Sequence, residues 1–239
     1  MVRMTAPHLT LHAISSMATQ YVLADVCQRY LQQSGVSVEI EFVGGVDAAK
    51  RVQAGEQFDM VLLAADAIDK LINSGHLLAG SRCDWVKSAI AVAVHADAPL
   101  PSMGTEAQLR DTVMAADSLC YSTGPSGTYL ENLFKRWGVF EQLQSRILIA
   151  PAGTPVGLLV AQGKAALGFQ QRSELVHQTG IQVIADLPAE VAHITSFSAG
   201  IGLAATEQAP RLQAVRDFLQ FLTSPAQDAV KASHGMMSL

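Results

Sequence analysis

The sequence is poor in charged residues. They make up only 15% of the 239 residues, and the formal net charge is −5. Without an excess of Lys and Arg there is no basic stripe of the kind that nucleic acids bind, so we expect no nucleic-acid partner. An anionic ligand would have to be held by local geometry, because the overall field does not attract it.

Metal-binding and redox patterns are also absent. The three cysteines, Cys27, Cys83 and Cys120, are far apart, and no Cys-x-x-Cys or Cys/His spacing occurs. The seven histidines show no ligand spacing either. The sequence therefore predicts no metal site and no cofactor. Cys27 lies in an apolar helical pattern and Cys120 in an apolar strand pattern, so we expect both thiols to be buried and inert.

Long apolar runs are missing as well. No stretch is long and apolar enough to span a membrane, and no signal-type run precedes the first expected strand. We therefore expect no membrane insertion. Two locations remain open: the cytoplasm if Met1 is the native start, and the periplasm if an export signal has been trimmed.

Nucleotide and nucleophile motifs are absent too. Gly44-Gly45 lacks the rest of a G-x-G-x-x-G fingerprint, and no P-loop occurs. Gly124-Pro125-Ser126-Gly127 is not a G-x-S-x-G elbow, and no obvious acid and base accompany Ser126. The sequence assigns no catalytic residue by these criteria.

What the sequence does contain is a regular alternation of short apolar runs and amphipathic helical patterns, with 49% apolar residues overall. This alternation is typical of an α/β fold, in which helices cover a largely parallel sheet. The expected strands are 9–14, 38–43, 60–64, 88–95, 118–121, 146–149, 166–169, 183–186 and 193–204. The expected helices are 17–34, 47–54, 67–74, 106–111, 129–137, 155–161, 172–179 and 210–223, with a last short helix after residue 224.

Two of these strands, 88–95 and 193–204, are long and bracket the second α/β series. The chain is therefore expected to build one lobe, leave it for a second, and return. This gives lobe 1 as residues 1–87 and 195–239, lobe 2 as 88–194, and hinge strands near 88–95 and 193–204. Ligand loops gather at the carboxyl ends of parallel strands, so a cleft between two such lobes is the expected ligand site.

The most informative loop runs from Tyr121 into the helical pattern that begins near Tyr129. It is rich in hydroxyls and glycine, and backbone N–H groups at a helix N-terminus lack intrahelical acceptors. Together with the helix dipole, they form an anion site. The candidate ligand-binding residues here are Ser122, Thr123, Gly124, Ser126, Gly127 and Thr128.

Other loops also follow a strand and open a helix, and each has a simpler structural interpretation. A hydroxyl at Ser15 or Ser16 can be a plain helix N-cap, and Gly44-Gly45 a plain tight turn. Thr154 fits an N-cap with Pro155 at the first helical position. Two amides end another strand, where they would be costly if buried without partners. The candidate ligand-binding residues from these loops are Ser15, Ser16, Gly44, Gly45, Thr154, Pro155, Val156, Gln170 and Gln171.

Over nearly its whole length the chain resembles a type II periplasmic solute-binding protein, most similar to the molybdate-binding branch. The resemblance lies in the Ser15-Ser16-Met17 loop, the segment 52–62 with Ala65-Asp66, the segment 166–174 and the segment 218–227. It implies two α/β lobes with mixed sheets, joined by two crossing strands, which close on a ligand by hinge motion. It also implies a monomer that can serve an ABC transporter permease.

The chain departs from the molybdate-binding pattern at two positions. Gly44-Gly45-Val46-Asp47 replaces a serine-bearing loop, and Gln171 stands where molybdate binders place a tyrosine. The segments Gly124-Pro125-Ser126-Gly127 and Gly168-Phe169-Gln170-Gln171 are similar to an offshoot of the family, aconitate isomerase. In such an enzyme Ser15, Ser16 or a bound water are candidates for the base, and Lys87 could supply a positive charge.

Two hypotheses follow. The first is a small-anion binding protein of the ABC-transporter type, which holds an oxyanion or a di- or tricarboxylate in its cleft by hydroxyls and backbone N–H groups. The alternative is an aconitate-isomerase-like enzyme that moves a double bond in a tricarboxylate by a 1,3-proton shift, with one group taking the proton and others stabilising the dienolate. On the sequence alone the first is favoured as the broader interpretation.

Overall fold

The computed structural model describes residues 9–239. It divides into two compact units. Unit 1 comprises the residues up to Val86 together with Ser196–Ser233 and Met237–Leu239, and unit 2 comprises Lys87–Thr195 with His234–Met236. Two long strands, β4 (Cys83–His95) and β9 (Ile194–Ile201), contribute residues to both units.

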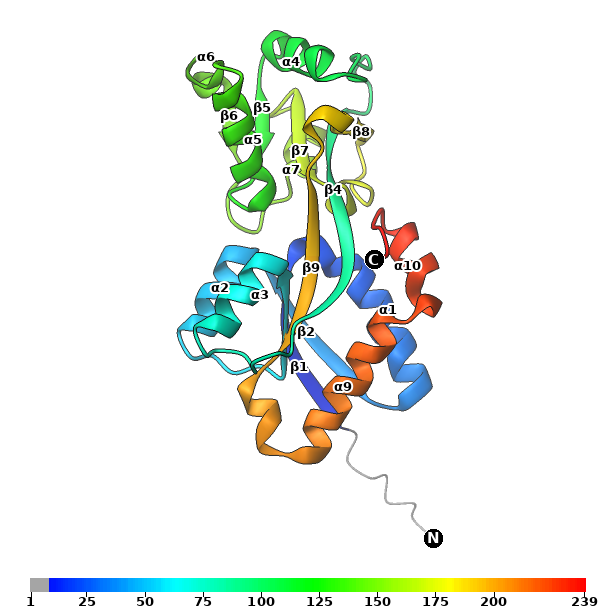
Figure 1. The fold of residues 1–239 in the computed structure, drawn as a ribbon. Helices are drawn as coiled ribbons and strands as arrows, with labels where there is room; N and C mark the ends of the chain where they lie inside the picture. The colour runs from blue at the N-terminus through cyan, green and yellow to red at the C-terminus, as the bar shows by residue number, and fades with distance from the viewer. Residues whose placement is uncertain (1–8) are drawn as a thin grey trace. The chain divides into compact units, whose positions relative to one another are not determined.

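Unit 1 is built on the strand order β2-β1-β3-β9 (Figure 1). Strand β1 pairs in parallel with β2 and β3, and β3 pairs antiparallel with β9. Because parallel neighbours run in the same direction, the carboxyl ends of β1, β2 and β3 lie at one edge of this sheet. The strands are β1 (Thr10–Ser16), β2 (Ser37–Val43) and β3 (Met60–Ala64).

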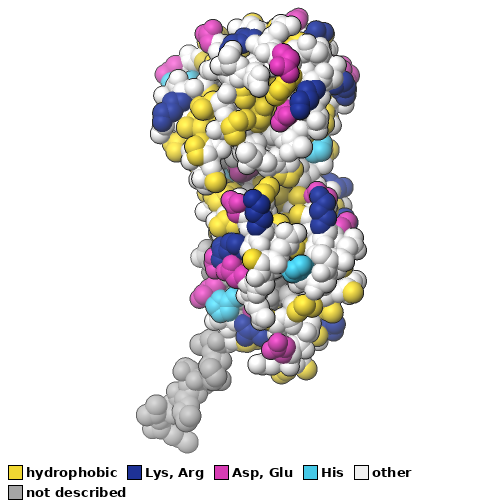
Figure 2. All heavy atoms as spheres, turned by 90° about the vertical axis from the view of Figure 1, so that its left-hand side faces the viewer, with side chains coloured by type: hydrophobic (Ala, Val, Ile, Leu, Met, Phe, Trp, Pro, Cys, Tyr) yellow, Lys and Arg dark blue, Asp and Glu magenta, His cyan; other side chains and the backbone are white. Residues whose placement is uncertain are grey.

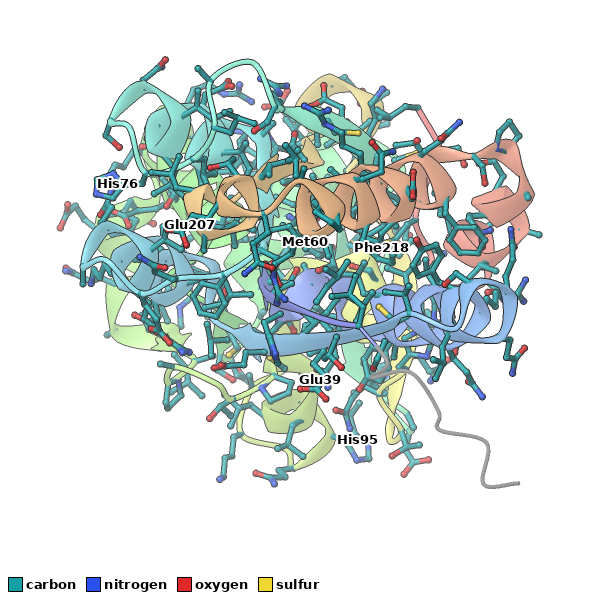
Figure 3. All side chains as sticks on the ribbon, turned by 90° about the horizontal axis from the view of Figure 1, so that it is seen from below. Glu39, Met60, His76, His95, Glu207 and Phe218 are labelled. Carbon is teal, nitrogen blue, oxygen red and sulfur yellow. The ribbon has the colours of Figure 1, made fainter. Side chains whose placement is uncertain are left out.

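Helices cover both faces of the sheet of unit 1, as Figure 1 shows. Apolar side chains of α2 and α3 form one core cluster with β1 and β3, around Ile14, Val61 and Leu63. Met60 and Phe218, labelled in Figure 3, are both fully buried in this unit. The helices are α1 (Gln20–Ser34), α2 (Gly45–Gln53), α3 (Ala65–Asn73), α9 (Ala209–Thr223) and α10 (Asp228–Ser233).

Unit 2 has the strand order β4-β7-β5-β6, with β8 also paired to β4. Strand β5 pairs in parallel with β6 and β7, whereas β4 is antiparallel to β7 and β8. The sheet of this unit is therefore mixed. Its remaining strands are β5 (Leu119–Tyr121), β6 (Ile147–Ile149), β7 (Leu167–Gln171) and β8 (Ile181–Asp186).

Successive side chains of a strand point to opposite faces, and this alternation separates two core clusters in unit 2. Leu119 and Tyr121 pack in the cluster that contains α4 and α5, while Cys120 packs in the cluster of α7. The helices of unit 2 are α4 (Glu106–Ala115), α5 (Pro125–Arg136), α6 (Phe140–Leu143), α7 (Val156–Ala161) and α8 (Arg172–Leu175). Short 3₁₀ turns occupy 17–19, 144–146, 189–191, 203–207 and 225–227.

Several element boundaries differ from the sequence-based expectation. The helix expected over 172–179 ends at Leu175, and the strand expected over 193–204 ends at Ile201. The Gly202 N–H still donates to the Asp59 carbonyl at 2.8 Å, and the strand ends there because the 3₁₀ turn of residues 203–207 begins directly after Gly202. Four-residue α6 was not expected at all.

The thiols are free, as expected, but not equally buried. Cys120 is buried, and desolvation raises its pKa to about 11. Cys27 is only partly buried, so the expectation of a buried side chain was wrong for this residue. Desolvation of its thiol nevertheless raises the pKa to about 12. Both groups stay protonated at neutral pH, so neither is a reactive thiolate.

Candidate functional site

In unit 1, two of the expected loops meet at the carboxyl edge of the parallel strands. Ser16 pairs in register with Val43, so the chain after β1 and the Gly44-Gly45 segment after β2 leave the sheet side by side. A Cβ atom on Gly45 would lie 3.6 Å from the Ser16 Cβ. The structure thus brings Ser16 and Gly45 into contact.

The two serines at the end of β1 have different hydrogen-bonding states. Ser15 Oγ donates to the Leu62 carbonyl at 2.8 Å and lies 2.7 Å from Thr19 Oγ1. Ser16 makes no side-chain capping bond, and its Oγ is buried without a partner within residues 9–239. A buried polar atom without a partner is costly, so Ser16 is the hydroxyl that has capacity left for a ligand.

Helix α2 begins beside Ser16. Its first intrahelical bond runs from the Ala48 N–H to the Gly44 carbonyl at 2.9 Å, so the N–H groups of Gly45 and Val46 precede the ladder. Asp47 is exposed in the first turn of α2, and its carboxylate lies close to Gly44. A Cβ atom built on Gly44 would be 3.3 Å from a carboxylate oxygen of Asp47. That carboxylate competes with any anion for the positive end of the helix.

In unit 2 the carboxyl ends of β5, β6 and β7 also lie at one edge, since the three strands are mutually parallel. The segment 122–124 leaves β5 there, the segment 150–155 leaves β6, and Gln171 ends β7. The structure therefore collects the expected candidates of this unit at one sheet edge.

The loop after β5 leads into α5, a helix of 12 residues. Its N-cap is Gly124, which has no side chain to cap the helix. The first intrahelical bond joins the Thr128 N–H to the Gly124 carbonyl at 3.1 Å. Ser126 and Gly127 are buried at this end of the helix. Their N–H groups precede the first intrahelical bond and can be offered to an anion.

The other members of this loop are more exposed. Thr123 and Thr128 are exposed, and Ser122 is partly buried. Thr128 Oγ1 donates to the Gly124 carbonyl at 3.3 Å, so that hydroxyl is engaged within the loop.

The loop before α7 is different. Pro155, not Thr154, is the N-cap of α7, so the expected capping role of Thr154 is wrong by one residue. The Val156 N–H donates to Gln170 Oε1 at 3.0 Å. This backbone donor is therefore bonded to a side chain, and Thr154 uses its own N–H for the Pro151 carbonyl at 2.9 Å.

The two glutamines at the end of β7 point to opposite faces of the sheet. Gln170 faces α7 and is bonded at both ends, since its Nε2 donates to Glu174 Oε1 at 2.6 Å. Gln171 pairs with Ile90, a member of the core cluster on the α5 side. Its Nε2 donates to Thr195 Oγ1 at 2.8 Å, while its Oε1 is buried without a partner in the described part of the chain.

Glu174 is a functional candidate that the sequence interpretation missed. Burial raises the pKa of its carboxyl from 4.5 to about 8, and bonds from Gln170 and the Gln171 backbone lower it by less. The available signal was the Gln171-x-x-Glu174 spacing, which resembles a capping box at the start of α8. A carboxyl that holds a proton near neutral pH is uncommon and often marks a functional site.

The described residues were also searched for a metal-binding cluster and for a membrane-spanning helix. No group of three or more His, Cys, Asp or Glu side chains within residues 9–239 could hold a metal ion. In that same range, no helix has both the length and the apolar character needed to cross a bilayer. On the face drawn in Figure 2, acidic and basic side chains are interspersed rather than grouped by sign.

Two cavities in unit 1 lie away from the expected residues. One of about 120 Å³ is lined by Phe58, His76 and Leu203 among others, and one of about 660 Å³ lies between α1 and α9. His76, labelled in Figure 3, belongs to the smaller. None of the expected ligand-binding residues lines either cavity.

The strand order of the two units and the passage of β4 and β9 through both define the fold of type II periplasmic binding proteins. A periplasmic molybdate-binding protein of Azotobacter vinelandii has this fold, with a TM-score of 0.76 and 19% identity over 95% of this chain and 98% of that one. A tungstate-binding protein of Desulfovibrio alaskensis G20 is similar at a TM-score of 0.70 and 15% identity, covering 97% and 99% of the two chains.

The family follows from the sequence match. The model of the bacterial extracellular solute-binding protein family matches residues 11–237, and the chain belongs to that family. The chain is also 34% identical to an aconitate isomerase of a Pseudomonas species, over 232 residues that make up 95% of this chain and 86% of that protein. This relative supports the alternative hypothesis better than the one favoured on sequence alone.

Proposed function

We propose that the protein is an isomerase of the aconitate-isomerase type, which moves a double bond within a tricarboxylate by a 1,3-proton shift. The observation that carries this proposal is the 34% identity to an aconitate isomerase along 95% of the chain. The oxyanion-binding neighbours named above are only 15–19% identical, and they support the fold alone.

The reaction needs no redox partner. A proton leaves the CH₂ carbon of the substrate, and the electron pair of that C–H bond becomes the new C=C bond. The electrons of the former double bond take up a proton at the other end of the three-carbon unit. Atoms and electrons therefore balance within the substrate, and what the protein must supply is a proton acceptor and donors for the dienolate charge.

The site chemistry is compatible with this task. Buried Ser16, the start of α2, and Ser126 with Gly127 at the start of α5 offer neutral hydrogen-bond donors. Donors of this kind hold carboxylates and stabilise negative charge that develops on them in the transition state.

The direct test is to incubate the purified protein with trans-aconitate, and separately with cis-aconitate, and to follow the vinyl protons by NMR. We expect each isomer to be converted to the other until both mixtures have the same composition. Conversion no faster than in a protein-free control would refute the isomerase.

A second candidate is a small-anion binding protein that delivers its ligand to an ABC transporter permease. Membership of the solute-binding family and the unpartnered Ser16 hydroxyl favour it. A thermal-shift screen with molybdate, sulfate, phosphate, citrate and both aconitates separates the candidates. An anion at a hundredfold its dissociation constant stabilises the protein by about 2.7 kcal/mol. Stabilisation by molybdate or sulfate without isomerisation would favour the binding protein, and no shift with any anion would refute both.

Variants test the site itself. We expect Ser16→Ala and Ser126→Ala each to weaken aconitate binding about tenfold or more, since each removes the hydroxyl of a buried serine at a strand or helix end where the anion is proposed to bind, although the backbone N–H of Ser126 remains. Ser37→Ala, at the opposite end of β2, and exposed Ser145→Ala are matched controls that should bind normally. Normal binding by both site variants would mean that the anion lies elsewhere.

A further inference from the structure

His193 lies at the carboxyl edge of the sheet of unit 2, where the expected ligand loops of that unit also begin. Gln171, the last residue of β7, pairs in register with Ile90 of β4. The Ile90 N–H donates to the His193 carbonyl at 3.1 Å. His193 is thus bonded to the residue that pairs with the end of β7, and it directly precedes β9.

The imidazole of His193 stacks on the ring of Tyr129, a residue of α5. The two ring centroids are 4.3 Å apart, and the ring planes are inclined by 20°. The Tyr129 hydroxyl donates to the Val191 carbonyl at 2.8 Å, which holds the ring in place. A side chain on an α-helix covers the turn that precedes its own Cα, so the Tyr129 ring and the imidazole stacked on it lie beside the first turn of α5. That turn carries the N–H groups of Ser126 and Gly127, which precede the first intrahelical bond.

The ring nitrogens of His193 have no hydrogen-bond partner within residues 9–239, and the side chain is only partly buried. Every other histidine in that range has a ring nitrogen next to a polar or charged group. These groups are a carboxylate oxygen of Glu39 at 3.6 Å for His12, the Ser74 hydroxyl at 2.8 Å for His76, the Asp97 N–H at 3.2 Å for His95, and each other's ring at 2.8 Å for His177 and His234. The His193 imidazole therefore has both nitrogens available to a ligand at the sheet edge.

The protonation state of His193 suits a proton acceptor. Burial lowers the pKa of its imidazole below the usual 6.5, and no charged side chain contributes to this shift. The ring is therefore neutral at neutral pH and can take a proton directly. Ser15 and Ser16, the side chains that the sequence suggested as a base, are weaker choices, because a serine hydroxyl needs an adjacent base to activate it.

We propose that His193 is the catalytic base of the isomerisation. One ring nitrogen takes the proton from the CH₂ carbon of a tricarboxylate whose carboxylate is held by the N–H groups at the start of α5. The electron pair of the broken C–H bond forms the new C=C bond, and the electrons of the former double bond accept a proton at the far carbon. The imidazolium delivers that proton and becomes neutral again, so no co-reactant is needed. The proposal rests on the proposed function, because it assigns a group to that reaction.

The test compares His193→Gln and His193→Phe with the wild type, with trans-aconitate as the substrate. Gln keeps a hydrogen-bonding side chain and Phe keeps a ring for the stack on Tyr129, but neither takes up a proton at neutral pH. We expect each variant to lower kcat about 100-fold or more, while the dissociation constant of trans-aconitate changes by less than about threefold. His95→Gln makes the same chemical change at the other end of β4 and should keep the kcat of the wild type.

A second measurement follows the exchange of substrate protons in D₂O by NMR. We expect the wild type to place deuterium on the substrate carbons during conversion, and both His193 variants to lose this exchange together with the conversion. A His193→Phe protein with nearly the kcat of an active wild type would show that the ring only packs on Tyr129, and would overturn this proposal alone. Variants that no longer convert aconitate but still exchange its protons would overturn it too, because another group then removes the proton.

A wild type that neither converts aconitate nor exchanges its protons contradicts the proposed function, and this proposal with it. Should both variants fail to fold, the wild type itself can be modified with diethyl pyrocarbonate, which acylates neutral imidazole, and the modified residues mapped by mass spectrometry. We expect activity to fall in proportion to modification of His193, and trans-aconitate to slow that modification. Full activity after complete modification of His193 would overturn the proposal.

Discussion

The clearest structural test of the ligand loop is Gly127→Ala. Gly127 lies in the first turn of α5, and a Cβ atom there would stand 1.7 Å from the Ser122 carbonyl oxygen and 3.0 Å from Tyr121 Cδ2. The carbonyl belongs to the backbone, so no flexible side chain can move aside. The loop after β5 and the start of α5 would have to separate by well over an ångström.

The magnitude follows from two opposing effects. Forcing a methyl group into a packed site costs about 1–3 kcal/mol, whereas replacing Gly by Ala in a helix returns up to about 1 kcal/mol. Because the contact is with a backbone atom at 1.7 Å, the cost lies at the upper end of that range, and we expect a net loss of about 2 kcal/mol, which a domain with about 5–15 kcal/mol of stability survives. Anion affinity should fall more steeply, because the backbone donors of Ser126 and Gly127 move with the loop.

The assay is urea unfolding followed by circular dichroism, together with the thermal shift produced by trans-aconitate. Gly124→Ala is the control within the same loop: its Cβ would lie 3.5 Å from Ser122 Oγ, an ordinary contact. We expect this control to unfold close to the wild type. A Gly127→Ala protein with wild-type urea midpoint and wild-type anion response would refute both the close approach and the role of the loop.

Three further changes test the rest of the structure. Arg211→Leu leaves the buried Asp59 carboxylate without its two-pronged ion pair, and should cost about 3 kcal/mol in urea unfolding; a loss below about 1 kcal/mol would contradict this. Gly202→Ala places a Cβ 1.8 Å from the Phe58 carbonyl oxygen, so the free energy of unfolding in urea should fall by about 1–3 kcal/mol. An unchanged urea midpoint would count against this contact. Asp47→Asn removes the carboxylate at the start of α2, so sulfate or aconitate should bind about two- to fivefold more tightly at low salt. Equal affinity of the variant and the wild type would argue against an anion near that helix.

Much of the fold could be predicted from local patterns. The apolar run Met60–Ala64 is the strand β3 with the expected bounds, because a strand that is buried on both faces of a sheet leaves an uninterrupted apolar signature. Gly35 and Gly75 follow α1 and α3 in the left-handed conformation, at φ 74° and 76°. This is the backbone geometry that glycine adopts without strain, so the helix ends could be read from the sequence.

Boundaries set by tertiary contacts could not be predicted. The pattern 172–179 favours a helix of two turns, but α8 ends at Leu175 and His177 contacts His234, a residue 57 positions away. The Asp59–Arg211 ion pair, which ties the residue before β3 to α9, also joins residues far apart in the sequence. No local propensity contains such information.

The candidate site was predicted in outline but not in its hydrogen bonding. The strand-end rule locates Ser15 and Ser16 equally well, and only the structure shows that Ser15 is bonded to Leu62 while Ser16 Oγ has no partner among the described residues. Likewise, the sequence places Gln170 and Gln171 together, but strand alternation sends them to opposite faces. The proton-holding Glu174 depends on desolvation, which a sequence does not display.

The division of the chain has a consequence for the order of events during synthesis. Unit 2 is nearly continuous in sequence, whereas β3 of unit 1 must wait for β9, which follows more than a hundred residues later. As the ribosome releases the chain, unit 2 can acquire all of its strands while β3 still has an unpaired edge. An unpaired edge of an all-apolar strand is prone to association with other chains, so we expect the nascent protein to need chaperone protection until Ile201 has emerged.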